Sequence, residues 1–371
     1  MLLTIVFYLF IASLVVQLLF HLFSYGKLAF YHRPQTSKQT EIPKSVSVIV
    51  CAHNEEENLK NLFSSLARQN HPDYEIIVIN DRSTDDTDML LQEKSKEFPQ
   101  LKIITVDKIP EGFNGKKYGL SLGIKLAKND IILFTDADCY PVSDQWISEM
   151  TAPFSDSQKI VLGYSQYEKQ PGLLNAFIRY ETLYTGILYL SSALAGSPYM
   201  GVGRNIAHRK SFFLENKGFR SHIKVTGGDD DLYVNQYADK KNTGIAVGPQ
   251  ALVYSFPKSD WASYFRQKKR HLSVGKFYKF SDKFKLNLLA VSQLLFWITF
   301  IILIIMWKEP YIVLAGFLVR IVLICSIFRR SSSKLGDNFN TWLVPGFDLL
   351  FVFYYFFIGY MAFFSKNIKW K

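Results

Sequence analysis

Apolar residues gather at the two ends of the chain, whereas its middle alternates short apolar runs with polar segments. At the N-terminus, Leu2–Phe23 is almost wholly apolar and is long enough to cross a bilayer as a helix. A secretory signal peptide needs a basic first region, a shorter apolar core and small residues at a cleavage site, and none is evident here. We therefore expect a retained transmembrane anchor over residues 1–24 and a linker over residues 25–44, which contains Pro34 and Pro43.

The C-terminal part of the chain holds three more apolar stretches, each close to the roughly twenty residues that a membrane-spanning helix requires. They are Leu288–Trp307, Tyr311–Phe328 and about Trp342–Phe364. Arg320 lies in the middle of the second stretch, so it needs a polar partner or a protein-lined site at membrane depth. These stretches predict a transmembrane region over residues 288–371, in which the orientation of the last span stays open.

Four short apolar runs in the middle of the chain alternate with segments of helical periodicity. Their β-branched residues are typical of buried strands, and the intervening apolar positions keep the spacing of amphipathic helices. The expected strands are Val46–Ala52, Glu75–Asn80, Lys102–Val106 and Ile131–Asp136. Alternation of this kind implies an α/β fold over residues 45–257, with a mostly parallel sheet, right-handed crossovers and helices on both faces.

Polar side chains follow three of these strands. Asn54 comes after the first strand, Asp81 ends the second, and Asp136 and Asp138 follow the fourth. Because ligands of such sheets bind beyond the carboxyl ends of the strands, we expect these residues to line one binding site.

Asp136 and Asp138 stand at alternate positions, so in an extended segment both carboxylates project to the same side. A hard divalent cation, Mg²⁺ or Mn²⁺, would relieve their repulsion and complete its oxygen shell with substrate phosphates. The alternative is a plain strand-to-turn junction that ends at Pro141. The polar residues at the other strand ends favour the binding site.

A second acidic segment carries Asp229, Asp230 and Asp231 directly after Gly227 and Gly228. Capping of the helix that follows would account for one acid but poorly for three. Together with the acids at the strand ends, this segment predicts a catalytic role.

The formal net charge of +11 is local. Between Lys258 and Lys285 there are nine lysines and arginines against two aspartates, a local net charge of +7. Because this patch leads directly into an apolar span, we expect it to contact an anionic membrane surface over residues 258–287 and not nucleic acid. The three cysteines show no disulfide or zinc spacing, which indicates a reducing compartment.

Five ordered motifs between about Ser45 and Gly275 resemble the membrane-bound family-2 glycosyltransferases. These are inverting enzymes with a GT-A nucleotide-sugar domain, and they include ceramide glucosyltransferases and the processive synthases of chitin, cellulose and poly-N-acetylglucosamine. The motifs are Val-Ile-Val-Cys-Ala-His-Asn-Glu55, Val-Ile-Asn-Asp-Arg-Ser-Thr-Asp85, Thr-Asp-Ala-Asp138, Gly-Gly-Asp-Asp-Asp-Leu232 and Gln-Lys-Lys-Arg-His271.

The resemblance implies roles for the residues at the strand ends. Asn54, Glu55 and Asp81 would hold the nucleoside of the donor. Asp136 would lie near the ribose, the diphosphate and the metal, and Asp138 would bind the metal. A further residue, Lys116, would approach the diphosphate from the start of its helix.

Other roles concern the acceptor. Asp229 would be the general base, but Gly228 replaces the glutamate of the family pattern Glu-Asp-x-Asp-Leu, so Asp230 is a rival, and Asp231 is expected to contact substrate. Gln267 and Arg270 match the family motif Gln-x-x-Arg-Trp. His271 stands where tryptophan is usual, at the expected position of the acceptor sugar.

The expected function is therefore inverting transfer of a sugar, with a UDP-sugar as the favoured donor, to a membrane-associated and lipid-linked acceptor. A processive polysaccharide synthase is the first alternative and a nucleotidyltransferase the second. Because nucleotide sugars are cytosolic, the protein is expected to be a multi-pass protein of the plasma (inner) membrane with a cytosolic catalytic domain. Arg329, Arg330 and Lys334 would lie on the cytosolic side, in agreement with the positive-inside rule. If the last stretch crosses the membrane, however, the tail lysines 366, 369 and 371 would lie on the other side, against the rule.

Overall fold

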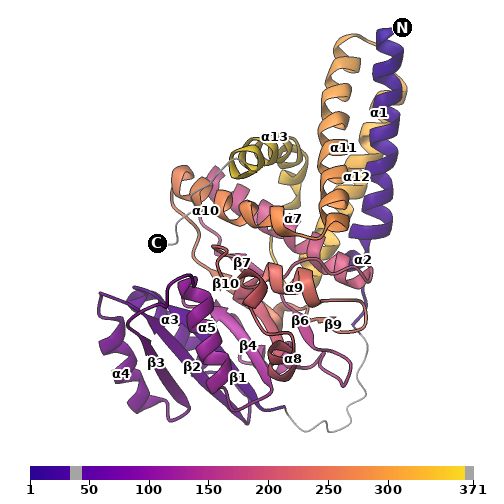
Figure 1. Cartoon of the computed structure of the whole chain (residues 1–371). Coiled ribbons are helices and arrows are strands. Elements are labelled where there is room, and N and C mark those ends of the chain that lie inside the picture. The colour runs from indigo at the N-terminus through magenta and orange to yellow at the C-terminus, as the bar shows by residue number, and fades with distance from the viewer. Residues whose placement is uncertain (34–43, 364–371) are drawn as a thin grey trace.

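In the described part of the chain, the central domain is built on a seven-stranded mixed sheet with the order β3-β2-β1-β4-β8-β6-β9. The computed structural model describes residues 1–33 and 44–363 (Figure 1). Strands β1 to β4 are parallel, whereas β8 is antiparallel to both β4 and β6. The strands of this sheet are β1 (Val46–Ala52), β2 (Tyr74–Asp81), β3 (Leu101–Val106), β4 (Ile131–Asp136), β6 (Ile160–Leu162), β8 (Ile206–Arg209) and β9 (Thr243–Ile245).

A smaller sheet lies beside the end of β4, with the order β5-β10-β7. Its strands are β5 (Cys139–Pro141), β7 (Ser165–Tyr167) and β10 (Val253–Ser255). Because β5 begins directly after Asp138, the segment that carries the paired acids is tied into this sheet on its C-terminal side.

Helices cover both faces of the large sheet, as the sequence predicts. One face packs on α3 (Glu56–Leu66), α4 (Thr87–Glu97) and α6 (Trp146–Thr151). The other packs on α5 (Gly115–Leu126), which approaches closely because Gly119 and Gly123 face Ile79. A Cβ at either glycine would lie within 2.9 Å of that side chain.

The aromatic helix α7 (Leu173–Leu194) belongs to the core. Its side chains are buried between the large sheet and the C-terminal helices. The remaining helical elements of the catalytic part are η2 (Gly203–Asn205), α8 (Lys210–Glu215), η3 (Arg220–His222), α9 (Asp231–Tyr237), η4 (Pro249–Ala251), α10 (Trp261–Val274) and η5 (Gly275–Phe277).

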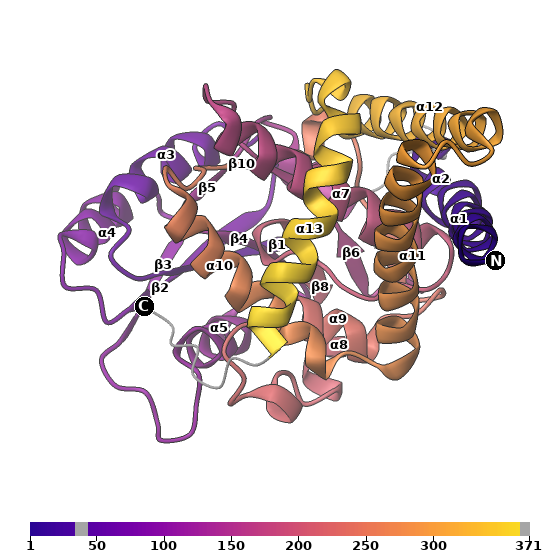
Figure 2. The same ribbon diagram turned by 90° about the horizontal axis from the view of Figure 1, so that it is seen from above.

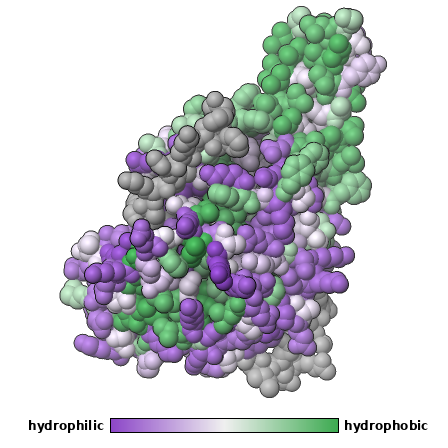
Figure 3. All heavy atoms as spheres, in the orientation of Figure 1, coloured by the Kyte–Doolittle hydropathy of each residue, from purple (hydrophilic) through white to green (hydrophobic). Residues whose placement is uncertain are grey.

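Among the described residues, four helical segments are long and apolar enough to cross a membrane. α1 (Leu2–Leu19), α11 (Phe280–Ile305) and α12 (Pro310–Leu335) pack together and project from the catalytic domain (Figure 1). The fourth segment comprises η6 (Thr341–Leu343) and most of α13 (Val344–Phe363). Hydrophobic residues cover the projecting helices, while hydrophilic residues dominate the visible catalytic face (Figure 3).

Two boundaries differ from those predicted. Helical structure continues past Phe23 through η1 (Phe20–Tyr25) and α2 (Gly26–Ala29), because Leu28 and Ala29 find buried positions against the core. Residues 25–29 of the predicted linker are therefore helical, and residues 34–43 lie outside the described part. At the other end, α11 already begins at Phe280, within the predicted basic segment.

Arg320 finds its partner inside the membrane bundle, as its mid-span position requires. Its guanidinium donates to both carboxylate oxygens of Asp348 on α13, at 2.6 and 3.2 Å, and to Gln17 of α1 at 3.1 Å. Asp348 also accepts hydrogen bonds from Gln293 and Trp297 of α11. This buried network joins all four apolar segments.

A second buried network fixes the end of α12 to the catalytic domain. Asp337 accepts hydrogen bonds from Arg179 of α7 at 2.8 Å, from Tyr164 at 2.9 Å and from Gln166 at 2.5 Å. Because Asp337 directly follows the helix end at Gly336, the membrane helices hold a fixed position relative to the catalytic core.

Candidate active site

The register of the sheet brings the predicted strand-end residues to one edge. Asp136 of β4 pairs with Cys51 of β1, and the next residue of β1, Ala52, pairs with Asn80 of β2. The loops after β1 and β2 therefore begin side by side with the end of β4. The sheet geometry confirms that these residues share one edge.

Asn54 joins the loops that follow β1 and β2. Its φ of 57° is left-handed, a conformation that asparagine tolerates better than most residues. Its side-chain oxygen accepts the backbone N–H of Thr84 at 2.7 Å, and its own N–H donates to Ser83 at 3.0 Å. Asp81 is buried and accepts hydrogen bonds from Arg82. Asn54 and Asp81, two of the three predicted nucleoside-binding residues, therefore also have structural partners.

Lys116 connects the two acidic segments. Its Nζ lies 2.9 Å from Asp136 Oδ1 and 3.0 Å from Asp229 Oδ2. Burial opposes the charge of Lys116, but the surrounding aspartates hold its pKa well above the ordinary value. A single ammonium group thus bridges the carboxylate at the end of β4 and the first aspartate of the glycine-rich turn.

Asp136 and Asp138 have the donor set of a hard-cation site. Ligand atoms of these two residues and of Cys139 lie within 4.8 Å of one another. Burial, and then the charge of Asp136, raises the pKa of Asp138, which is the electrostatic cost of holding two carboxylates together. Two carboxylates that leave room for further oxygens suit Mg²⁺ or Mn²⁺. Glu55 lies near the same pair, and burial raises its pKa, with Asp138 and Asp136 adding to the effect.

The three neighbouring aspartates have different surroundings. Asp230 caps α9 by accepting the N–H of Asp231 at 2.8 Å, and it also accepts the N–H of Gly203 at 2.5 Å. Asp231 points away and accepts from Tyr278 at 2.8 Å. Both oxygens of Asp230 are therefore held by backbone groups, whereas Asp229 contacts the ammonium of Lys116.

These surroundings also give the carboxyl groups of the three aspartates different pKa values. Burial alone would raise the pKa of Asp229, but Lys116 holds it below its ordinary value. Burial and the charge of Asp229 raise the pKa of Asp230 to about 6. Burial, and then the charge of Asp230, raises the pKa of Asp231 further. Asp229 is thus the member of the run that stays ionised most readily.

Two basic residues with no predicted role also contribute. Lys117 is fully buried, and its Nζ donates to the carbonyl oxygens of His222 at 2.7 Å and Val225 at 2.9 Å, which holds the loop leading to Asp229. Burial lowers its pKa to about 8. Arg204 stacks over Tyr167 at 4.5 Å. The sequence signals were the second lysine of Gly-Lys-Lys117 and the glycine loop Gly201–Asn205, but neither pattern specifies a contact.

Helix α10 brings the Gln-Lys-Lys-Arg-His run to the same region. Gln267 donates to Tyr167 at 3.4 Å, on the ring that Arg204 covers. His271 is an exposed residue of the same helix. Desolvation, followed by several neighbouring cations that include Arg270, lowers its pKa well below the ordinary value. The imidazole of His271 is therefore neutral.

The cavity between these elements is lined by residues from both acidic segments. Its walls include Lys116, Thr135, Asp136, Gly203, Asp229 and Asp230. Gly203 is close to Asp230, and a Cβ at this glycine would lie 3.2 Å from Asp230 Oδ2. Of the predicted site residues, Lys116, Asp136, Asp229 and Asp230 line this cavity. The others do not: Asn54, Glu55, Asp81, Asp138, Asp231, Gln267, Arg270 and His271.

The fold and the rim of acids define a membrane-attached α/β domain of the nucleotide-binding type. Residues 47–213 match the sequence model of "Glycosyl transferase family 2". The chain therefore carries a family-2 glycosyltransferase domain, as its motifs predict.

Known relatives agree with this family. Over 241 residues the chain is 27% identical to the probable glycosyltransferase YdaM of Bacillus subtilis, a match that covers 62% of this chain and 54% of that protein. It is 35% identical over 101 residues to the beta-monoglucosyldiacylglycerol synthase of Nostoc sp., covering 27% of this chain and 21% of that protein. The chain thus spans about half of the first relative and less of the second.

A solved structure resembles nearly the whole chain. The mannosyltransferase PcManGT from Pyrobaculum calidifontis, determined with GDP-Man and Mn²⁺, covers 94% of this chain and 99% of its own, with a TM-score of 0.59 and 16% identity. At that identity the likeness shows the fold alone, and it confirms the GT-A architecture expected from the motifs.

Proposed function

We propose that the protein is an inverting glycosyltransferase that moves a sugar from a nucleoside-diphosphate sugar, with UDP as the favoured nucleotide, to a lipid-linked acceptor. The observation that carries this proposal is the double contact of Lys116. Its ammonium lies within 3.0 Å of Asp136, at the predicted diphosphate end, and of Asp229, at the predicted base. Donor and acceptor groups would therefore meet at one point.

In this proposal the chain's own residues bind the donor and move a proton. Asn54, Glu55 and Asp81 hold the nucleoside, while Lys116 swings from the carboxylates towards the diphosphate, whose negative charge grows as it leaves. Asp229, freed from part of its ion pair, takes the proton of the attacking acceptor hydroxyl. The hydroxyl forms the new bond to the anomeric carbon as the bond to the diphosphate breaks on the opposite face, which inverts the centre.

Asp136 and Asp138 would hold a divalent cation, Mg²⁺ or Mn²⁺. When bound, this cation supplies positive charge that stabilises the leaving diphosphate. The fit rests on two oxygen ligands within 4.8 Å of each other and on the raised pKa of Asp138.

The acceptor side of the site adjoins the membrane. Helix α10, which carries Gln267, Arg270 and His271, packs against the apolar helix α13. A substrate that approaches over α10 would therefore arrive from the membrane surface, as a lipid-linked acceptor does. The name of the Nostoc relative, a glucosyldiacylglycerol synthase, supports the same choice.

Analysis of the product tests this function. Purified protein is incubated with radiolabelled nucleotide sugars, Mg²⁺ or Mn²⁺, and membrane lipid extract. We expect label in an organic-extractable glycolipid and release of a nucleoside diphosphate. A long polysaccharide would instead identify a processive synthase, and release of pyrophosphate would identify a nucleotidyltransferase.

We also predict that the catalytic domain is cytosolic and that the membrane is the plasma (inner) membrane. Lys96, which is exposed on α4, is replaced by cysteine and treated in intact cells with a membrane-impermeant thiol reagent. We expect labelling only after permeabilisation. The matched control is Trp307→Cys in the turn between α11 and α12, which should react in intact cells. The reverse pattern would contradict the cytosolic placement.

A further inference from the structure

The last helix, α13, is apolar enough to cross a membrane, but it is oriented differently from α1. In Figure 1, α1, α11 and α12 project together from the catalytic domain, and α13 lies across their side. From above, α13 is drawn along its length while α1 is seen end-on (Figure 2). We propose that α13 lies flat in the leaflet adjoining the catalytic domain. Of the described helices, α1, α11 and α12 would then cross the membrane, and the chain after α13 would stay on the catalytic side.

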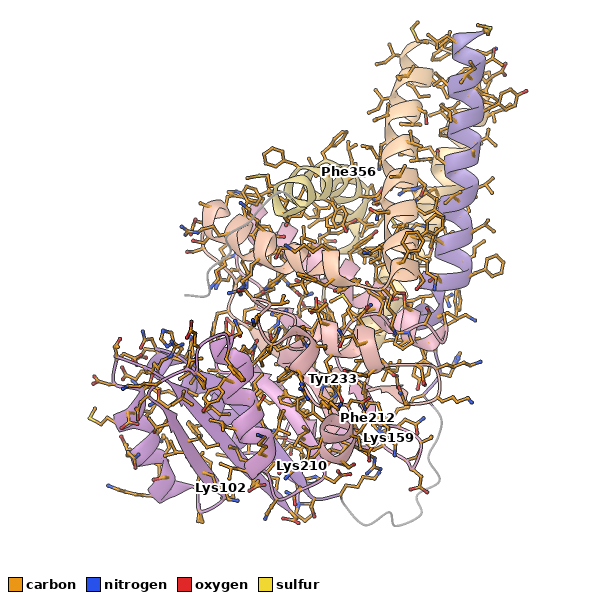
Figure 4. All side chains as sticks on the ribbon, in the orientation of Figure 1. Lys102, Lys159, Lys210, Phe212, Tyr233 and Phe356 are labelled. Atoms are coloured by element: carbon orange, nitrogen blue, oxygen red, sulfur yellow. The ribbon has the colours of Figure 1, made fainter. Side chains whose placement is uncertain are left out.

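One face of α13 follows the catalytic domain for two turns. Phe347 contacts Phe177 of α7 with ring centroids 5.7 Å apart, and Tyr354 stacks on Tyr264 of α10 at 5.9 Å. These contacts on α13 are separated by seven residues, or about 10 Å of helix. A helix leaving the domain to cross a membrane would lose such contacts after its first turn, whereas a helix along the domain surface keeps them. Phe356, labelled in Figure 4, packs instead with the bundle helices.

The depth of α13 follows from its ion pair with α12. Arg320 lies ten residues from the start of α12 at Pro310, or about 15 Å from the far end of the bundle. The hydrocarbon core is about 30 Å thick, so Asp348 meets Arg320 near the middle of the membrane. A buried ion pair at this depth is sustained by its mutual hydrogen bonds. It anchors the N-terminal part of α13, in the second turn after Val344.

A neighbouring face of α13 presents apolar side chains to the surroundings. Leu350, Phe353, Phe357 and Met361 are exposed, with spacings of three, four and four residues that form one stripe along the helix. Acyl chains of the leaflet are the occupant that fits, because α11 and α12, which the proposal places in the membrane, expose apolar side chains of the same kind. Trp342, 90% exposed just before α13, is a residue type that favours the membrane interface.

This placement also removes a conflict in the charge pattern. Basic residues precede α13 near the end of α12, and more follow it in the tail beyond the described residues. They are Arg329, Arg330 and Lys334 on one side and Lys366, Lys369 and Lys371 on the other. A crossing α13 would divide them between the two faces of the membrane. A flat α13 leaves all of them on the catalytic side, in agreement with the positive-inside rule.

Protease protection in proteoliposomes tests the course of the chain. One version of the full chain carries an epitope after Lys371, and another carries it between Lys308 and Glu309 in the α11–α12 turn. An antibody to the catalytic domain marks the orientation of each vesicle population. We expect external protease to digest the C-terminal epitope in the same vesicles in which it digests the catalytic domain. It should digest the turn epitope only in vesicles of the opposite orientation. The proposal is overturned if the C-terminal epitope is digested in the same vesicles as the turn epitope.

Spin-label depth measurements test the orientation of α13 itself. Labels are placed at Leu350→Cys and Met361→Cys in a chain whose native cysteines are replaced by serine. A crossing helix would separate these positions by about 16 Å in depth, whereas a flat helix gives nearly equal depths. The matched pair Leu318→Cys and Arg329→Cys on α12 has the same eleven-residue spacing and should show the full separation. A similar separation on α13 would refute a flat helix.

Discussion

Replacing Asp229 by asparagine is expected to lower the rate of sugar transfer by about 10²–10⁴-fold, the usual contribution of a general base. Asparagine has nearly the same shape, and its oxygen can still accept from Lys116, but it cannot take the proton of the acceptor hydroxyl. Affinity for the nucleotide sugar should stay nearly unchanged, since this carboxylate acts on the acceptor. Single-turnover transfer and calorimetric donor binding measure the two quantities separately.

Asp230→Asn is the matched control, because it makes the same chemical change one residue further on. Both oxygens of Asp230 accept backbone N–H groups, and an asparagine NH₂ would face one of those donors. We expect this variant to lose thermal stability, because it weakens the cap of α9, and to retain more transfer activity than Asp229→Asn. Near-normal turnover in Asp229→Asn, together with loss of turnover in Asp230→Asn, would assign the role of general base to Asp230.

The sequence predicts the strand ends of this site because its signals are local. Runs such as Val46–Ala52 and Ile131–Asp136 carry their burial pattern within seven or fewer residues. Parallel pairing then places the residues after them on one edge without any knowledge of distant contacts. Asn54, Asp81 and Asp136 could therefore be placed at one edge of the sheet before any coordinates were known.

The division of labour within Asp229–Asp231 depends on contacts from distant parts of the chain. The N–H that holds Asp230 comes from Gly203, and the hydroxyl that holds Asp231 comes from Tyr278. No spacing within the acidic run encodes these partners. Gly228 illustrates the same limit, since its φ of 73° and its packing against Leu232 are visible only in the folded chain.

The direction of a helix is likewise absent from its composition. Length and apolar composition predict that α13, like α11, can cross a membrane. Its direction is set by Asp348, which pairs with Arg320 on α12, and by aromatic residues that pack on α7 and α10. These partners lie on elements that the sequence pattern treats separately.

Removing the cation is expected to weaken donor binding by at least about tenfold, through either chelation with EDTA or the substitution Asp138→Ala. Loss of outer-shell groups around a bound metal already costs about 10–100-fold, and Asp138 would be a direct ligand. Donor affinity is measured by calorimetry with and without Mn²⁺. If both changes act on one ion, Asp138→Ala should cause little further loss once EDTA is present, because the two effects cannot add.

Asp156→Ala serves as the control for this test, because Asp156 is exposed and accepts a hydrogen bond from Lys159 through its backbone carbonyl, which the substitution keeps. Its donor affinity should match that of the unmodified protein and remain fully sensitive to EDTA. The metal assignment fails if donor binding and turnover persist undiminished in chelator. In that case Lys116 and Arg204 would have to balance the diphosphate charge alone. A metal-independent enzyme should then lose donor affinity in Lys116→Met while Asp138→Ala retains it.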